Sequence, residues 1–275
     1  LKDGVLVHIS QVPSGLQCGC KCPACGETLI AKKGDKVIHH FAHKSTIECE
    51  FGYQTSLHFA AKKIISENGI MRVPAVYLEF PNTDKRELIE PEEVLQVSEV
   101  ILEKKLHNII PDILLVTNIG KIIVEIFVTH EIDLEKEEKI KKMGIPTIEI
   151  DLSKIDRNIS EQELQDILIN ENEHKVWIYN GKREAYYEKF LKVSEVKPVI
   201  TRNYALHVDN CPIGKRVWKC NRYANLLYDC QGCDYLIGYE STWKNNMEQE
   251  SAIRCTGKLR IAHKEDFEIP FEKRM

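Results

Sequence analysis

The cysteines of this chain are divided between its two ends, and this division constrains the fold more than any other feature. Five of the ten lie between positions 18 and 49, and the other five between positions 211 and 255. A segment as short as the first cannot bury a large hydrophobic core, so a bound metal is expected to supply its folding free energy. The cysteine-free middle must then hold the conventional core. We expect three parts, with the boundaries 1–50, 51–180 and 181–275.

Two closely spaced pairs, Cys22 with Cys25 and Cys230 with Cys233, indicate metal binding rather than disulfide bonds. The N-terminus has no apolar segment of the signal-peptide type, and no apolar run approaches the roughly 18 residues that span a bilayer. In such a chain, CxxC pairs favour metal or redox chemistry. We therefore expect reduced thiolates that bind zinc, in a cytoplasmic protein with no membrane partner.

Cys22 and Cys25 provide the first half of the N-terminal site. The two residues between them allow a tight turn that places both sulfurs on one metal ion. The other two ligands are expected among His40, His43 and Cys49, whose spacings suit a tetrahedral zinc site. His43 with Cys49 is the preferred pair, and His40 is the alternative. The N-terminal part is thus predicted to resemble a zinc ribbon.

A redox-active CxxC is the alternative interpretation of the first pair. That chemistry needs a helix directly after the motif, whereas residues 27–35 have the pattern of a β-hairpin. Cys18 and Cys20 are spare in the zinc interpretation, because four ligands already complete a tetrahedral site.

Cys230 and Cys233 form the centre of the second predicted zinc site. Cys211 and Cys255 lie before and after this pair, where each would open or close a strand. A site with four thiolates is closed and therefore structural rather than catalytic. Cys220 ranks below them and is kept as the alternate ligand, because it follows Trp218 inside a predicted strand. Cys255 is also open to interpretation as a small buried hydrophobic residue.

The middle of the chain alternates helical and strand patterns. A spacing of 3.6 residues between apolar positions predicts a helix at 55–66. Asp133 is suited to cap a second helix, which Gly144 closes. Extended segments are predicted at 71–80, 97–102, 109–116, 121–128, 147–152 and 177–179, and a short helix at 183–193. Pro74 indicates an edge position or a bulge. This order describes a compact α/β core.

Two carboxylates, Asp112 and Glu125, interrupt neighbouring apolar strands. If the connecting turn centres on residues 118 and 119, the two face each other with Cβ atoms about 5 Å apart. A bulge at Gly120 would shift this register by one residue. Burying carboxylates without partners is costly, and a shared Mg²⁺ or Mn²⁺ would remove that cost while activating a phosphodiester. The alternative is a surface edge at which Asp112 meets a lysine.

Taken together, these motifs resemble the competence protein CoiA-like family. The similar segments, in chain order, are 22–25, 40–43, 55–62, 111–112 and 123–125. The resemblance covers roughly residues 18–152, and residues 124–130 are similar to a branch of the family with a C-terminal cysteine-rich zinc module. Members join an N-terminal zinc ribbon to a nuclease domain of the PD-(D/E)xK type. The resemblance implies a restriction-endonuclease-like fold, a DNA substrate and Mg²⁺.

The chain departs from that pattern at two positions. Gln54 stands where the first helix usually carries a glutamate, and Phe127 stands where a lysine or glutamine usually follows the acidic strand residue. The usual lysine orients the attacking water and stabilises developing charge. A replacement is therefore expected from Lys136, near the start of the next helix, or from Lys62.

Further polar residues are candidates for the same site. Gln54, His58 and Lys62 recur every four residues and form one stripe on the predicted helix, which faces either the metal or solvent. His130 follows the acidic strand and is either a general acid or base or a structural residue at a helix entry. The predicted catalytic set is Asp112, Glu125, Lys136, His58, Gln54 and His130.

The distribution of charge suits a DNA partner. The net charge is −4, yet residues 17–46 hold five Lys against two acids, and residues 201–228 hold five Lys or Arg against Asp209 alone. Such basic ends either bind nucleic acid or form a solvated surface. The first functional hypothesis is a metal-dependent DNA nuclease in DNA processing or defence. The second is a DNA-binding or assembly protein on a degenerate nuclease fold. A protein partner or a homo-oligomer stays open.

Overall fold

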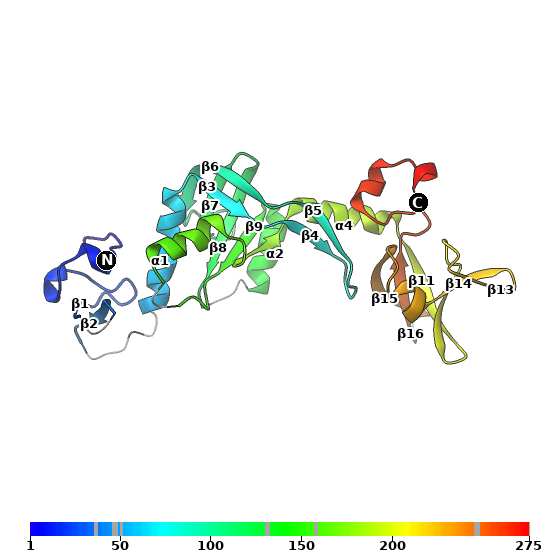
Figure 1. The fold of residues 1–275 in the computed structure, drawn as a ribbon, viewed down its shortest axis with the longest axis horizontal. Helices are drawn as coiled ribbons and strands as arrows, with labels where there is room; N and C mark the ends of the chain where they lie inside the picture. The colour runs from blue at the N-terminus through cyan, green and yellow to red at the C-terminus, as the bar shows by residue number, and fades with distance from the viewer. Residues whose placement is uncertain are drawn as a thin grey trace. The chain divides into compact units, whose positions relative to one another are not determined.

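The chain forms two compact units (Figure 1). The computed structural model describes residues 1–35, 38–45, 49, 52–129, 133–156, 159–244 and 248–274, with the backbone alone at 242–244 and 248–250. Unit 1 contains residues 1–74 and 93–179, and unit 2 contains residues 75–92 and 180–275. A segment from the middle of the chain thus belongs with the C-terminal residues. The division into three domains at residues 50 and 180 stays a prediction.

The N-terminal segment of unit 1 contains a two-stranded sheet. Strand β1 (Leu29–Lys32) pairs antiparallel with β2 (His40–His43). Two 3₁₀ turns precede it, η1 (Ile9–Gln11) and η2 (Leu16–Cys18). Among the residues that the structure describes here, the buried core contains Ile9, Val12, Cys18, Cys20, Cys22, Leu29 and Ala31. So small a core agrees with a domain whose stability depends on metal ligands.

A six-stranded sheet forms the centre of unit 1, in the order β10–β9–β8–β7–β6–β3. Strands β8 and β9 run parallel, and all other neighbours are antiparallel. The strands are β3 (Ile70–Val73), β6 (Glu93–Leu102), β7 (Ile113–Thr117), β8 (Gly120–Phe127), β9 (Thr147–Asp151) and β10 (Lys175–Tyr179). Pro74 follows β3 directly, because a proline nitrogen cannot donate a hydrogen bond to a sheet.

Helices cover both faces of this sheet. On one face lie α1 (Gly52–Glu67) and α3 (Glu161–Gln165), which continues as the π-helical segment η3 (Asp166–Asn170). On the other face lies α2 (Leu134–Met143). The alternation of β7 explains the two cores, because Ile113 and Leu115 pack with α1 whereas Leu114 packs with Ile140 of α2. This layering confirms the mixed α/β class.

The β7–β8 hairpin has the predicted register. Ile113 lies opposite Val124, and Thr117 lies opposite Gly120. The next position along the two strands therefore brings together Asp112 and Glu125. Gly120 has a φ of 120°, which few other residues adopt, and the Thr117 hydroxyl donates to the Gly120 carbonyl at 2.7 Å. The one-residue shift considered for Gly120 does not occur.

The two long helices of unit 1 end close to the predicted positions. Asp133 caps α2 as predicted, because its side chain accepts a hydrogen bond from the Lys136 backbone N–H at 2.7 Å. Gly144 closes α2 with a φ of 70°. Helix α1 begins at Gly52, three residues before the predicted start. No helix among the described residues is long and apolar enough to cross a membrane.

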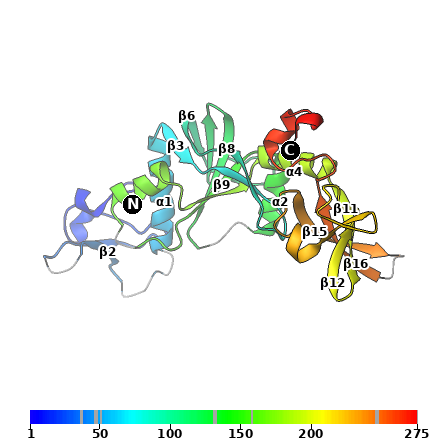
Figure 2. The same ribbon diagram turned by 45° about the vertical axis from the view of Figure 1, so that its right-hand side comes forward.

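Unit 2 is built on a six-stranded antiparallel sheet, in the order β13–β14–β12–β11–β16–β15. Figure 2 shows β11, β12, β15 and β16 of this sheet. Its strands are β11 (Glu195–Arg202), β12 (Ala205–Asp209), β13 (Arg216–Trp218), β14 (Asn221–Asn225), β15 (Leu236–Lys244) and β16 (Glu248–Cys255). The other elements are the hairpin β4 (Val76–Glu79) and β5 (Arg86–Glu90), helix α4 (Gly181–Val193), the π-helical segment η4 (Leu226–Cys230), and the 3₁₀ turns η5 (Lys264–Glu268) and η6 (Phe271–Lys273).

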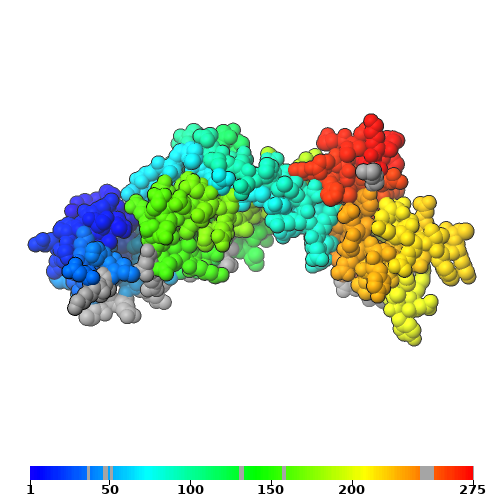
Figure 3. Space-filling view, in the orientation of Figure 1, coloured from blue at the N-terminus to red at the C-terminus, as the bar shows by residue number. Residues whose placement is uncertain are grey.

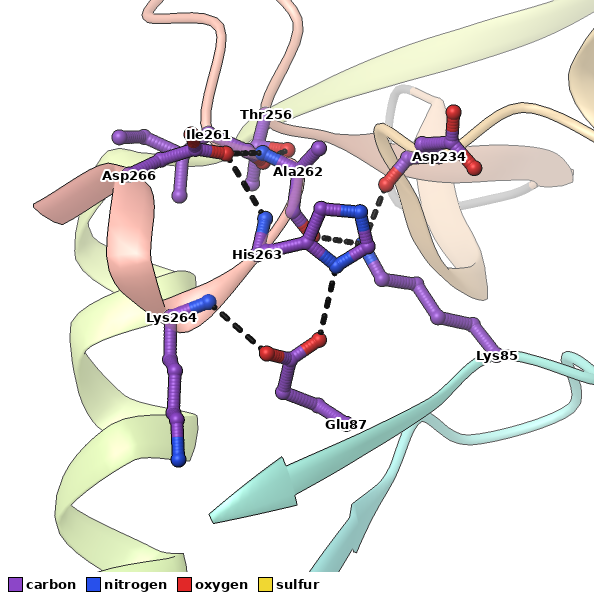
Figure 4. Close-up of polar contacts among 9 residues, drawn as sticks. All are labelled: Lys85, Glu87, Asp234, Thr256, Ile261, Ala262, His263, Lys264 and Asp266. Carbon is purple, nitrogen blue, oxygen red and sulfur yellow. Dashed lines mark hydrogen bonds and ion pairs between the residues drawn. The ribbon is translucent and has the colours of Figure 1, made fainter.

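Polar contacts join the β4–β5 hairpin to the C-terminal residues of unit 2 (Figure 4). Glu87 is only 6% exposed, and its carboxylate accepts a hydrogen bond from the Lys264 backbone N–H at 3.0 Å. The ring nitrogen Nδ1 of His263 lies 3.1 Å from the same carboxylate. Lys85 donates to the carbonyl oxygen of Asp234, directly after the second CxxC pair. The hairpin is thus an integral part of the C-terminal fold.

Candidate functional site

Four N-terminal side chains converge on one point, namely those of Cys22, Cys25, His43 and Cys49. Their ligand atoms all lie within 4.8 Å of one another. Cys25 Sγ is 3.3 Å from His43 Nε2, and Cys22 Sγ is 3.9 Å from Cys49 Sγ. Three thiols and an imidazole with these separations are the donor set of a tetrahedral zinc site. The cluster contains the preferred pair, His43 and Cys49, together with the first CxxC pair.

Local backbone structure positions these four ligands. Gly26, with a φ of 73°, donates from its N–H to the Cys22 carbonyl at 2.9 Å and closes the turn of the CxxC pair. His43 ends β2, and the Gly52 N–H donates to the Cys49 carbonyl at 3.2 Å as α1 begins. A Cβ atom at Gly52 would lie 3.4 Å from the Cys49 sulfur. The first residue of α1 therefore packs directly on the cluster.

The electrostatics around Cys22 favour its thiolate form. Burial alone raises the pKa of the Cys22 thiol, but hydrogen bonds from the backbone N–H groups of Cys25 and Ala24 outweigh it and lower the pKa to about 7. Because the thiolate is the form that binds metals, this part of the cluster suits zinc near neutral pH.

The alternatives weighed for this site lie outside the cluster. His40 Nδ1 is 2.8 Å from the carbonyl oxygen of Ile38, so its ring contacts the backbone just before its own strand. Cys18 and Cys20 are buried in the small N-terminal core. Strand β1 follows the CxxC turn, so the helix that redox chemistry requires after Cys25 is not present in this described segment. The geometry thus favours a structural metal site.

The four preferred C-terminal cysteines, Cys211, Cys230, Cys233 and Cys255, line one cavity in unit 2. Burial raises the pKa of the Cys230 thiol to about 12, and the three neighbouring thiols add to this increase. A cation at the centre would reverse that effect, because it stabilises thiolates. Among the described residues, however, only the N-terminal set has all its ligand atoms within 4.8 Å. The second zinc site therefore stays a proposal.

Cys220, the alternate ligand, does not line this cavity. It is exposed, and with Lys219 it forms the two-residue turn between β13 and β14. The prediction that Cys220 lies inside a strand is wrong, because both turn residues have a left-handed backbone, with φ values of 46° and 67°. Cys255, in contrast, ends β16, as expected for a residue that closes a strand.

A second polar group surrounds Asp112, directly before β7. Its carboxylate lies 3.0 Å from His58 Nε2 and 2.8 Å from Lys62 Nζ, both on α1. The backbone N–H of Ile126 donates to it at 2.9 Å. Burial alone would raise the pKa of Asp112, but the hydrogen bonds from His58, Lys62 and Ile126 hold the pKa well below its usual value. Lys62 is only 4% exposed, so this is not the solvated edge of the alternative interpretation.

Glu125, on β8, lies beside this group and is 4% exposed. One carboxylate oxygen is 2.8 Å from Lys136 Nζ of α2, whereas the other, Oε1, is buried and has no hydrogen-bond partner. Burial raises the pKa of Glu125 to about 7 despite Lys136, and the charge of Asp112 contributes to the increase. An unpaired buried acceptor is destabilising, so Oε1 marks a place where a bound cation would be stabilising.

Glu103 completes the group, although no sequence motif predicted it. Lys62 Nζ, which contacts Asp112, is also 2.7 Å from Glu103 Oε1. The Glu103 N–H donates to the Asp112 carbonyl at 3.1 Å. Leu102 pairs with Ile113 across β6 and β7, which brings the two acidic residues together. The only local signal was an acid directly after a predicted strand, and its meaning depended on that long-range pairing.

Two residues of the predicted catalytic set, Gln54 and His130, are not seen in contact with the carboxylates in the described part of the chain. Gln54 lies on α1 one turn before His58, but within the described structure it forms no hydrogen bond or ion pair with either carboxylate. His130 lies outside the described residues, so its role stays a prediction. Of the polar stripe on α1, the half with His58 and Lys62 therefore faces the carboxylates.

Comparison with known families adds one result. Residues 16–52 match the model of the family described as competence protein CoiA, N-terminal domain. The match spans all four residues of the Cys₃His cluster and supports a relation of this segment to the CoiA family. The carboxylate group and unit 2 lie beyond the matched residues. Searches with the chain found no matching curated protein and no matching solved structure.

Proposed function

We propose that the chain is a Mg²⁺- or Mn²⁺-dependent nuclease that hydrolyses DNA phosphodiester bonds, in DNA processing or defence. Asp112 and Glu125 hold the metal, on a core with the restriction-endonuclease-like PD-(D/E)xK fold. The observation that supports this most directly is a pair of carboxylates on neighbouring strands, one of which has a buried oxygen without a partner.

The donor set suits a hard divalent cation. Mg²⁺ and Mn²⁺ prefer carboxylate oxygens and retain several waters, and Asp112 and Glu125 supply such oxygens at the edge of a polar group. Asp112 is 19% exposed at its side chain, so solvent and a substrate phosphate have access from its side. When bound, the metal would act as a Lewis acid on the phosphodiester.

The lysines and His58 have roles that follow from their positions. Lys136 contacts Glu125 and Lys62 contacts Asp112, so each places a positive charge where a scissile phosphate would bind. Either one supplies the charge that Phe127 cannot provide. His58 contacts the Asp112 carboxylate, and its imidazole would be the general acid or base beside the metal.

The cysteine sites are structural in this proposal. The Cys₃His cluster holds one zinc ion, and the four cysteines of unit 2 hold a second. The match of residues 16–52 supports a competence-related role for the chain and is silent on nuclease activity. The basic residues around the two zinc sites suggest that both zinc modules contact DNA or a protein partner, while the cysteine-free core contains the residues that cleave DNA.

A DNA-binding or assembly protein on a degenerate nuclease fold is the second candidate. It is favoured by the direct ion pairs of Lys62 and Lys136 with the two carboxylates. These pairs neutralise the acids without any metal, and neither Gln54 nor Phe127 provides the side chain typical of active nucleases. In this case the polar group would serve stability alone.

Cleavage of plasmid DNA distinguishes the two candidates. The chain is incubated with linear and nicked plasmid in Mg²⁺ or Mn²⁺, beside Asp112→Ala, Glu125→Ala and the control Glu99→Ala, an exposed carboxylate on β6. We expect cleavage by the parent and the control, and a loss of at least about 100-fold in both site variants, as is typical when catalytic charge stabilisation is removed. Cleavage that persists in both variants would refute the site. Binding without cleavage by the parent would favour the second candidate.

Metal analysis tests the zinc sites separately. We expect close to two zinc ions per chain, one of which is lost in Cys255→Ser and retained in Cys220→Ser. A single zinc ion in the parent would restrict zinc to the Cys₃His cluster.

A further inference from the structure

The β13–β14 hairpin exposes an apolar surface at the edge of the unit 2 sheet. Strand β13 is the edge strand, and all three of its residues are exposed. Val217 is 64% exposed and Trp218 is 59% exposed. The yellow segment that contains this hairpin projects from its sheet in the ribbon and protrudes in the space-filling view (Figures 1 and 3). An indole with so little packing contributes little to the core of unit 2 and is available to a ligand.

The turn at the tip of this hairpin is strained. Lys219 and Cys220 have φ values of 46° and 67°, the conformation that Asn-Gly adopts most easily in a two-residue hairpin turn. Neither residue is glycine, asparagine or aspartate. Backbone strain of this kind is frequent at binding sites. Here the strained turn holds Trp218 and Lys219 together at the tip.

The hairpin also has positive charge that the rest of unit 2 does not neutralise. Of the five basic residues between positions 201 and 228, Arg202 pairs with Asp209 and Arg216 pairs with Asp229. The other three, Lys215, Lys219 and Arg222, form no ion pair within 4 Å among the described residues, and of these only Lys215 has an acid near it, because its charge also lowers the pKa of Asp229. This excess occurs in a chain whose net charge is −4.

Trp218 and Lys219 are arranged as a stacking surface with an adjacent cation. Lys219 Nζ lies 4.7 Å from the centre of the Trp218 ring, over one face of the indole. Since Trp218 is still 59% exposed, indole surface remains for a second planar group. A flat aromatic surface beside the Lys219 cation, on a hairpin with further positive charge, has the chemistry that binds a nucleic-acid strand, in which bases alternate with phosphates.

We infer that the β13–β14 hairpin binds single-stranded DNA, with Trp218 stacked on a base and Lys215, Lys219 and Arg222 against phosphates. The choice of DNA rests on the proposed function, but binding at this hairpin does not require cleavage. An apolar protein partner would cover Trp218 and leave three cations unpaired, whereas a DNA strand satisfies both features. Recognition of this kind tolerates many sequences, because every base has a flat face.

Binding is measured by fluorescence anisotropy of a labelled oligonucleotide of about 15 nucleotides, the upper range for such sites. The full chain is used without added Mg²⁺, so that cleavage does not interfere. We expect Trp218→Ala to weaken binding about tenfold, Trp218→Phe to retain most of it, and DNA to quench the fluorescence of Trp218. Replacing all three cations by Ala is expected to reduce the slope of log K against log salt by about 2.

Tyr204→Ala is the matched control. Tyr204 is a fully exposed aromatic residue in the two-residue turn between β11 and β12, and the adjacent Arg202 is already paired with Asp209. We expect unchanged affinity in this variant. Because Trp218 is exposed, Trp218→Ala is expected to keep the thermal midpoint of the parent, which is measured alongside.

Three outcomes would overturn the inference. In the first, Trp218→Ala binds DNA within about twofold of the parent. In the second, Tyr204→Ala loses as much affinity for DNA as Trp218→Ala does. In the third, Trp218→Ala changes the oligomeric state of the chain but not its affinity for DNA, which would identify a second copy of the chain as the occupant of the hairpin. Asp112→Ala separates this inference from the proposed function, since it is expected to abolish cleavage and keep the affinity for DNA. A chain that binds through Trp218 but never cleaves would refute the nuclease and leave the hairpin site intact.

Discussion

At the scale of single residues, strand geometry decides between two neighbouring histidines. His43 lies opposite Leu29 at the start of β1, close in the chain to Cys25. His40 lies opposite Lys32 at the other end of the pairing, and three residues along a strand also reverse the face to which a side chain points. His43 therefore reaches the thiols, whereas His40 does not.

This difference predicts the zinc content of two variants. His43→Ala is expected to lose the N-terminal zinc ion, because it leaves three ligands and an open position. His40→Ala is expected to keep it. Elemental analysis of both purified variants, with unfolding curves to confirm that each is folded, provides the measurement. Zinc loss in His40→Ala alone would contradict the assignment.

Lys175 is a buried cation whose pKa has a consequence for stability. It is 5% exposed on β10, and its Nζ donates to the Arg72 carbonyl at 2.8 Å. Burial lowers its pKa from 10.5 to about 7. Between these two pH values the unfolded chain binds a proton that the folded chain does not. The free energy of unfolding therefore increases as the pH rises from about 7 towards 10.5.

Lys175→Met removes this dependence. We expect the variant to be more stable than the parent at pH 7 by at least about 1 kcal/mol, since it no longer holds a desolvated ammonium group. Its advantage should decrease as the pH rises. Urea unfolding at pH 7, 8 and 9 provides the measurement, and a parallel pH dependence of the two proteins would show that Lys175 is not the source.

At the scale of elements, local signals predicted the helices better than the strand pairing. Helix α2 begins at a capping aspartate and ends at a glycine, as its sequence indicates. The β7–β8 register also follows from a short turn and from alternation. The pairing of β6 with β7 joins residues with no such local signal, so Glu103 was not foreseen as a neighbour of Asp112. Residues 130–132 lie outside the described part of the chain, so the role of His130 stays a prediction.

The cap of α2 provides a test at this scale. Asp133→Ala is expected to reduce the free energy of unfolding by about 1 kcal/mol, because the Lys136 N–H loses its acceptor at the helix start. Asp133→Ser should retain most of the stability. Both are measured by urea denaturation. If the two variants are equally stable, the cap is not important for the fold.

At the scale of the whole molecule, residues 75–92 leave the central sheet and join unit 2. Strand β3 ends at Val73, directly before Pro74, and the chain returns to the sheet at β6 only after the β4–β5 hairpin. The hairpin packs with unit 2 through the buried carboxylate of Glu87 and through Lys85 (Figure 4). The middle and C-terminal parts of the sequence are therefore not independent in folding.

Glu87→Ala tests this dependence. Without its carboxylate, the Lys264 N–H and His263 lose their acceptor, so we expect the free energy of unfolding of unit 2 to decrease by about 1–3 kcal/mol. Hydrogen exchange should accelerate at residues 261–268. Glu79→Ala, an exposed position on the same hairpin, is the control and should behave as the parent. Equal exchange in both variants would show that Glu87 does not hold the C-terminal segment.

The sequence by itself determined the features that depend on neighbouring residues. The CxxC turns, the caps of α2 and the opposition of Asp112 to Glu125 follow from spacing, since each involves a few bonds along one short segment. Only the tertiary structure decided which residues complete each site. Glu103, Lys62 and the Lys136 ammonium reach Asp112 and Glu125 from separate elements. Such choices depend on the packing of distant segments, which no local pattern records.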